Sequence, residues 1–273
     1  MSLTSTVNHL STIQTNFMRI ISYNTNGIRA AIKKGLLEWL QTNPADIICI
    51  QETKASKDDV DVKSIEALGF NTYWFSAQKK GYSGVAVFTK IKPDNVEYGH
   101  KKEQSDFEGR VLRLDFGKIT LINAYFPSGT SGDERQTYKY FWLKEFHDYL
   151  KDLRKTRPQL IITGDYNIAH TEIDIHDPKG NKNSSGFLPE EREWMSAFLA
   201  DGFIDTFRFI NPEAKGAYSW WSQRFPTVRL QNKGWRIDYI SITVNLKDKL
   251  KDAKIFPDVK QSDHCPIYAE LKL

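Results

Sequence analysis

The sequence predicts an α/β fold in which a sandwich of mixed sheets carries helices on its outer faces. Short apolar runs typical of buried strands recur along the chain, and amphipathic stretches typical of helices lie between several of them. Strands that alternate with helices and then cluster near the end indicate a layered α/β architecture. No internal linker, low-complexity tract or short repeat divides the chain, so residues 18–273 are predicted to form one domain.

Seven apolar runs are predicted as strands because they are short and rich in β-branched or aromatic residues. They cover residues 18–23, 46–51, 84–89, 119–125, 159–164, 236–241 and 267–271.

Three segments between the strands are predicted as helices. Residues 28–41 carry apolar side chains at helical spacing, begin after Gly27 and end before Asn43-Pro44. Residues 135–153 place aromatic side chains at the same spacing. Residues 189–201 begin with Pro189, which is tolerated in the first turn of a helix.

Length and composition narrow the class of protein. A chain of 273 residues with 40% hydrophobic and 26% charged residues is typical of a globular protein, and a net charge of +4 permits a nucleic-acid partner without requiring one. Residues 1–17 lack the features of a signal peptide and are expected to form a frayed extension. No run is long enough to span a membrane. Only two cysteines are present, and Cys49 lies in a predicted strand, which favours a reducing, cytoplasmic compartment.

Polar side chains stand where the predicted strands end. Asn24, Glu52, Tyr125 and Asp165 each end or follow such a run, and Asn167 comes two residues after Asp165. Each signal is weak alone, because a glutamate at a strand exit is usually solvated and Gly-Asp-x-Asn is often a turn. Together they are informative, since carboxylates gathered at one rim of a sheet are unfavourable unless a cation lies among them.

Asp238 and His264 form the second informative group. An inward-facing carboxylate can hold an imidazole in one tautomer and favour its charged form, as acid–base chemistry and phosphate binding require. Two structural alternatives stay open from the residues alone. Asp238 could instead form a structural salt bridge with Arg236 or a neighbour, and His264 could be a hydrogen-bonded loop histidine.

Eight segments in order resemble the exonuclease III family of apurinic/apyrimidinic endonucleases, within the endonuclease/exonuclease/phosphatase superfamily. The resemblance runs from about residue 18 to the C-terminus. The segments are Gln51-Glu-Thr-Lys54, Gly81-Tyr-Ser-Gly84, Asn123-Ala-Tyr-Phe-Pro127, Gly164-Asp-Tyr-Asn167, Pro178-Lys-Gly-Asn181, Gly186-Phe-Leu-Pro-Glu-Glu-Arg192, Gly234-Trp-Arg-Ile-Asp-Tyr239 and Ser262-Asp-His-Cys-Pro266.

The resemblance implies a four-layer α/β sandwich of two packed mixed sheets flanked by helices. It also implies a bound Mg²⁺, with Mn²⁺ as the alternative ion. Glu52 is the implied principal metal ligand, and Asn26 stands where some relatives carry a second acid. Asp263 is expected to assist the metal or to orient His264.

The implied catalytic residues are Asp165, His264, Asp238, Tyr125, Asn167 and Asn24. Asp165 would orient or deprotonate the attacking water, while Asn167 and Asn24 would donate hydrogen bonds to phosphate oxygens. Tyr125 would contact the phosphate or assist the leaving group. The sequence leaves open whether Asp165 or His264 is the general base.

The implied partner is double-stranded DNA with abasic sites or 3′ ends, bound by a monomer that does not associate with membranes. Trp220 and Trp235 would wall a pocket for an extruded abasic sugar, with Arg224 near the wedge that enters the duplex. A packing role for either tryptophan stays open, as does a solvated helix face for the basic residues. The implied substrate-binding residues are Arg29, Lys33, Lys34, Gly81, Tyr82, Trp220, Arg224 and Trp235.

The expected function is a Mg²⁺-dependent DNA-repair nuclease that cuts 5′ to abasic sites, digests duplex DNA from 3′ ends and removes 3′-blocking groups. One alternative is a superfamily phosphatase for inositol phosphates or phospholipid head groups, which would share the acids but lack the tryptophan pocket and the basic loop of residues 178–183. Another is a DNA-binding protein with a dead site, which predicts at least one missing site residue. The site residues Glu52, Asp165, Asn167, Asp238 and His264 are all present.

Overall fold

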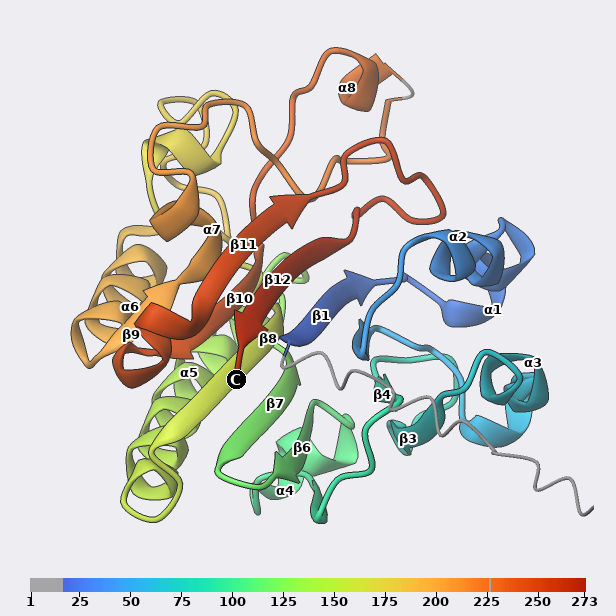
Figure 1. Cartoon of the computed structure of the whole chain (residues 1–273). Helices are drawn as coiled ribbons and strands as arrows, with labels where there is room; N and C mark the ends of the chain where they lie inside the picture. The colour runs from blue at the N-terminus through green and yellow to red at the C-terminus, as the bar shows by residue number, and fades with distance from the viewer. Residues whose placement is uncertain (1–16, 226) are drawn as a thin grey trace, which may run out of the picture.

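Two six-stranded mixed sheets pack face to face in the computed structural model, which describes residues 17–225 and 227–273 (Figure 1). In the first sheet the strand order is β11-β12-β1-β2-β4-β3, and β1 and β2 are its parallel pair. Its strands are β1 (Phe17–Asn24), β2 (Ile47–Gln51), β3 (Asn71–Phe75), β4 (Val85–Thr89), β11 (Leu250–Ile255) and β12 (Ile267–Lys272).

The second sheet repeats this plan with the order β5-β6-β7-β8-β10-β9, and β7 and β8 are its parallel pair. A parallel pair places the carboxyl ends of both strands at one edge of a sheet, where polar loop residues can converge. The strands are β5 (Asn95–Tyr98), β6 (Val111–Phe116), β7 (Ile119–Tyr125), β8 (Gln159–Asp165), β9 (Phe203–Asp205) and β10 (Asp238–Thr243).

Helices cover the outer face of each sheet. Figure 1 shows α1 (Ile28–Lys33), α2 (Leu36–Thr42) and α3 (Val62–Glu66) on one side, and α5 (Asp133–Arg154) and α6 (Pro189–Ala200) on the other. The shorter elements are α4 (Glu103–Phe107), α7 (Thr206–Ile210), α8 (Thr227–Leu230), η1 (Lys57–Asp59), η2 (Glu172–Asp174) and η3 (Val244–Lys249).

Alternation along the strands builds the layers. Ile47 and Cys49 of β2 point into the core between the sheets, whereas Ile48 and Ile50 pack beneath α1–α3. The same alternation in β8 sends Ile161 to the central core and Ile162 toward α5 and α6. Successive side chains of a strand face opposite sides of the sheet, so these runs are apolar on both faces. The predicted four-layer α/β sandwich is confirmed.

The predicted helix over residues 28–41 is wrong in one respect, because it is two helices. Gly35 has φ 89°, a left-handed conformation that glycine adopts readily, and it separates α1 from α2. The predictions for 135–153 and 189–201 are confirmed as α5 and α6.

All seven predicted strands are present, with ends that shift by one or two residues, but five further strands were not predicted: β3, β5, β6, β9 and β11. All of these except β6 are edge strands of the two sheets, where side chains are less completely buried. Phe17, the last residue of the predicted frayed extension, is instead the first residue of β1 and pairs with Lys272 of β12. The predicted frayed extension otherwise lies outside the described residues. Among the helices that the structure describes, none has the length and apolar character needed to cross a bilayer.

Candidate active site

The polar residues at the strand ends meet at one edge of the sandwich. Asn24 ends β1 of the first sheet, and Asp165 ends β8 of the second. Two hydrogen bonds between side chains join the sheets here: Asn24 Nδ2 donates to Asp165 Oδ2 at 2.8 Å, and Gln51 Nε2 donates to Asn123 Oδ1 at 2.7 Å. Asn123 Nδ2 also donates to the backbone carbonyls of Ile50 and Ala86 in the first sheet. All four side chains are buried, so these bonds fix the spacing between the two halves of the site.

Asp165 is held by three hydrogen bonds from two asparagines. The Asn167 backbone N–H donates to Oδ1 at 2.8 Å, and Asn167 Nδ2 and Asn24 Nδ2 donate to Oδ2 at 3.2 and 2.8 Å. Burial raises the pKa of Asp165, and the neighbouring Asp238 carboxylate raises it further, against the opposing effect of His264. The carboxylate is therefore oriented and is a better proton acceptor than an exposed aspartate.

His264 lies between two carboxylates. Its Nδ1 is 2.9 Å from Asp238 Oδ2, and its Nε2 is 3.8 Å from Asp165 Oδ2. Burial disfavours the charged ring, but the charges of Asp238 and Asp165 outweigh this and raise the pKa of His264. The structure thus brings Asp238 and His264 together, as the sequence predicted. The alternative pairing of Asp238 with Arg236 is wrong, because Arg236 pairs with two other acids, Asp174 and Asp205.

A second polar group surrounds Glu52. The Lys54 ammonium lies 3.0 Å from Glu52 Oε1 and donates to Asn26 Oδ1 at 2.5 Å. Asn26 in turn donates to Asp263 Oδ1 at 2.9 Å, and the Trp220 indole N–H donates to Asp263 Oδ2 at 3.1 Å. Asp263 thus links Asn26 to Trp220.

Three site residues adopt left-handed backbone conformations that non-glycine residues seldom take. They are Asn26 with φ 46°, Glu52 with φ 53° and Asn167 with φ 52°. Such conformations cost about 1–3 kcal/mol each and persist where the surrounding structure fixes them, which is common at functional sites. The sharp turns direct the side chains of strand-end residues toward one another.

A pocket of about 940 Å³ opens above these groups. Trp220 and Trp235 form part of its wall, their rings edge to face with centroids 5.9 Å apart. Both tryptophans also pack against the buried cluster of Ala169, Ile175, Phe187 and Ile237, so they have a packing role as well as lining the pocket. Its lining contains ten predicted site residues: Asn26, Glu52, Tyr125, Asp165, Asn167, Trp220, Arg224, Trp235, Asp263 and His264.

Asn24 and Asp238 lie beneath this pocket and act on it through Asp165 and His264. Tyr125 lines it, and burial together with the charges of Glu52 and Asp165 holds the pKa of the Tyr125 phenol well above its usual range. The phenol is therefore a hydrogen-bond donor at neutral pH.

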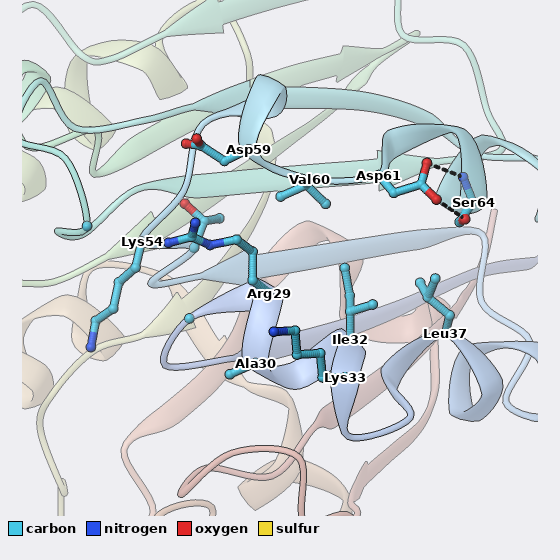
Figure 2. A pocket seen from close by; sticks show the side chains of 13 residues that line it. Arg29, Ala30, Ile32, Lys33, Leu37, Lys54, Asp59, Val60, Asp61 and Ser64 are labelled. Atoms are coloured by element: carbon cyan, nitrogen blue, oxygen red, sulfur yellow. Dashed lines mark hydrogen bonds between the residues drawn. The ribbon is translucent and has the colours of Figure 1, made fainter.

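The predicted basic residues of α1 lie to one side of the pocket, whereas Arg224 lines it. Arg29, Lys33 and Gly81 line a neighbouring cavity of about 640 Å³, and Figure 2 shows Arg29 and Lys33 on α1 across from Val60. Lys34, next to Lys33, is exposed. The predicted DNA contact Tyr82 accepts a hydrogen bond from Arg110 Nη2 at 3.3 Å.

Residues 21–264 match the Endonuclease/Exonuclease/phosphatase family. The chain belongs to this family. It is 44% identical over 251 residues to the exodeoxyribonuclease of Bacillus subtilis (strain 168), which covers 92% of this chain and 98% of that protein.

Two solved structures share the fold of this family member. The AP endonuclease from Archaeoglobus fulgidus matches with a TM-score of 0.85 and 30% identity, covering 94% of this chain and 100% of that one. The 3′ phosphatase NExo from Neisseria, bound to product DNA hairpin, matches with a TM-score of 0.86 and 26% identity over the same shares. The chain is therefore an enzyme of the exodeoxyribonuclease and AP endonuclease type, which excludes the non-enzymatic alternative.

The family is metal-dependent, and two sets of side chains in this member could hold an ion. Asp165, Asp238 and His264 bring ligand atoms within 4.8 Å of one another, but the hydrogen bond between His264 and Asp238 already uses two of them. Glu52 and Asn26 offer oxygen atoms, and both contact the Lys54 ammonium, so this position suits a cation.

Two contributing residues were not predicted. Lys54 stands in the quoted segment Gln51–Lys54 next to Glu52, so its place in that segment was an available signal. Ser219 donates to Asp238 Oδ2 at 2.6 Å and accepts from the Asp238 backbone N–H at 3.1 Å. Nothing in the spacing of Ser219 indicates this contact, because it depends on how residues 219–220 pair with Trp235.

Proposed function

We propose that this protein is a Mg²⁺-dependent nuclease that hydrolyses the phosphodiester 5′ to abasic sites in duplex DNA. On the same class of DNA it also acts as a 3′–5′ exonuclease and removes 3′-blocking groups, and it works as a monomer. The observation that carries the proposal is the group of Asp165, His264 and Asp238 at a pocket walled in part by Trp220 and Trp235, in which His264 is hydrogen-bonded to Asp238 and lies 3.8 Å from Asp165.

Asp165 is the general base for the attacking water. It lines the pocket, its orientation is fixed by Asn24 and Asn167, and its raised pKa suits proton acceptance near neutral pH. His264 is less suited to this role, because an imidazole held in its charged form by two carboxylates has no free lone pair.

His264 instead stabilises charge on the phosphate. As an imidazolium it presents a donor toward the pocket, while Asp238 holds the other ring nitrogen. Tyr125, as a neutral phenol, adds a second donor without adding negative charge to the site. Asn167 is engaged by its contacts with Asp165 and Phe126, so it serves the phosphate chiefly by orienting Asp165.

Glu52 and Asn26, with Asp263 behind Asn26, are the residues that would hold Mg²⁺. Their oxygen atoms match the preference of this ion, and the Lys54 ammonium already finds its partners there. When bound, the ion supplies charge neutralisation to the phosphate and the leaving oxygen. Glu52 and Asn26 hold their carboxylate and amide oxygens close together, since both oxygens contact the Lys54 ammonium.

The tryptophan pocket supports abasic-site selection. Trp220 and Trp235 are joined by two backbone hydrogen bonds of 2.9 Å, which hold the two residues side by side in the pocket wall. A nucleotide that has lost its base has no stacking or pairing to give up when it leaves the duplex, so its extrusion toward the tryptophan wall is favoured over that of an intact nucleotide.

The test is incision of a duplex that carries one tetrahydrofuran abasic analogue, in Mg²⁺ and in excess chelator, beside an intact duplex of the same sequence. We expect a single cut 5′ to the analogue in Mg²⁺ alone. Absence of incision, together with phosphate release from an inositol phosphate, would favour the phosphatase alternative.

A further inference from the structure

A buried ion pair lies behind the active site, outside the residues that touch the pocket chemistry. Lys139 of α5 and Glu191 of α6 are both 0% exposed, and Lys139 Nζ lies 2.5 Å from Glu191 Oε1. Burying two charges is unfavourable unless their remaining hydrogen-bonding atoms are satisfied. The other partners of this pair are therefore informative.

Lys139 reaches the general base through one residue. Its Nζ donates to the Asn167 backbone carbonyl at 2.8 Å. Asn167 has the left-handed φ of 52° and gives two hydrogen bonds to Asp165. The ammonium thus holds a strained turn in the one conformation that directs both Asn167 donors at the carboxylate.

Glu191 reaches the pocket wall through the loop before α6. Its Oε2 accepts from the backbone N–H groups of Gly186 and Leu188 at 2.6 and 3.0 Å. Gly186 has φ 93°, and a side chain there would lie 3.0 Å from the Trp235 ring. The carboxylate therefore sets the distance between this loop and the tryptophan, and Gly186 and Leu188 both line the pocket.

We infer that Lys139 and Glu191 are positioning residues whose ion pair aligns the general base, through Asn167, with the tryptophan wall, through Gly186. The inference rests on the proposed function for the identity of the reaction. One pair joins two parts of the site that belong to separate segments, residues 165–167 and 186–188. Loss of the ion pair should misplace both segments relative to the substrate, although no group that contacts the substrate is removed.

The experiment compares Lys139→Met, Glu191→Gln and the double variant with Arg113→Met. Arg113 pairs with Asp115 at 2.7 Å, and Asp115 lies opposite Thr120 at the start of β7, the far end from Tyr125. The control therefore removes a largely buried ion pair away from the site. Melting temperature, kcat and KM on the abasic duplex are measured for each protein.

Each single variant leaves one buried charge unpaired, so both are expected to melt at lower temperature. The double variant removes both charges and should recover much of this loss. Its kcat should stay about 10- to 100-fold below that of the unaltered protein with KM little changed, because the Asn167 carbonyl still lacks its donor. Arg113→Met should lose stability and keep its kcat. A kcat that follows melting temperature in all four proteins would overturn the inference.

A second measurement needs no variant and no activity. Hydrogen exchange on the unaltered protein should show the Gly186 and Leu188 amides exchanging far more slowly than that of Lys182 in the same loop. Equal exchange would refute the role of Glu191, even if the protein cut none of the DNA substrates. A slow amide pattern in a protein without nuclease activity would refute the proposed function alone.

Discussion

Replacing Asp165 by asparagine tests the assignment of the general base. The carboxylate accepts from the Asn167 N–H at Oδ1 and from two amide NH₂ groups at Oδ2. The side-chain amide of the new asparagine keeps only one acceptor oxygen. In one orientation its NH₂ group faces the NH₂ groups of Asn24 and Asn167, and in the other it faces the backbone N–H of Asn167. A mismatched buried group costs about 1–3 kcal/mol of stability. Loss of the buried charge offsets part of this.

The effect on turnover should be larger than the effect on stability. A positioned base contributes about 10²–10⁴-fold, which corresponds to about 3–5 kcal/mol in the activation barrier. We expect Asp165→Asn to reduce single-turnover incision of the abasic duplex by that factor. Its affinity for the same DNA, measured by fluorescence anisotropy in chelator, should persist.

The matched control is Asp115→Asn, a buried carboxylate of β6 that lies opposite Thr120, at the end of β7 away from the site. It should lose stability and keep its turnover. The assignment of Asp165 as base would be wrong if Asp165→Asn kept most of its turnover, or if it lost DNA affinity while its bound turnover was unchanged.

Three further predictions concern the pocket, the metal and pH. Trp220→Ala should reduce abasic-site incision more than 3′ trimming of intact nucleotides, and equal losses in parallel rate assays would indicate a packing role. Glu52→Gln should raise the Mg²⁺ concentration needed for half-maximal incision, and an unchanged titration would remove Glu52 from the ligand set. Burial, aided by Lys102, lowers the pKa of His100 to about 4, below its unfolded value, so its contribution is present above pH 6.5 and lost as pH falls. Urea unfolding should show a loss of about 3 kcal/mol between pH 7 and pH 4 from this group, and His100→Gln should reduce that pH dependence; an identical slope would contradict it.

The central strands could be predicted because both of their faces are buried. Runs such as Ile47–Gln51 and Gln159–Asp165 are apolar throughout, which separates them clearly from loops. The edge strand β5 reads Asn-Val-Glu-Tyr and has exposed ends, so its pattern does not differ from that of a loop. The break between α1 and α2 depends on one glycine within a regular apolar pattern, which periodicity does not register.

The site was predictable where a functional side chain directly follows a buried run. Glu52 and Asp165 met that condition, and Asp238 lies within such a run. Sequence could not predict that Asp263 contacts Asn26 and Trp220, because those residues are joined only by the folded arrangement of three distant segments. Sequence could not predict the ion pair between Lys139 and Glu191 either, since both residues look like ordinary polar positions on helices.

Because hydrogen bonds from Asn24 to Asp165 and from Gln51 to Asn123 hold the two sheets together at the site, the rate of catalysis should depend on the distance between the sheets. One sheet carries the residues suited to the ion, and the other carries the base. A perturbation that slides one sheet over the other by a fraction of a bond length separates these halves while leaving every strand paired. Modest pressure or a low denaturant concentration should therefore abolish nuclease activity before the circular dichroism signal shows any loss of secondary structure.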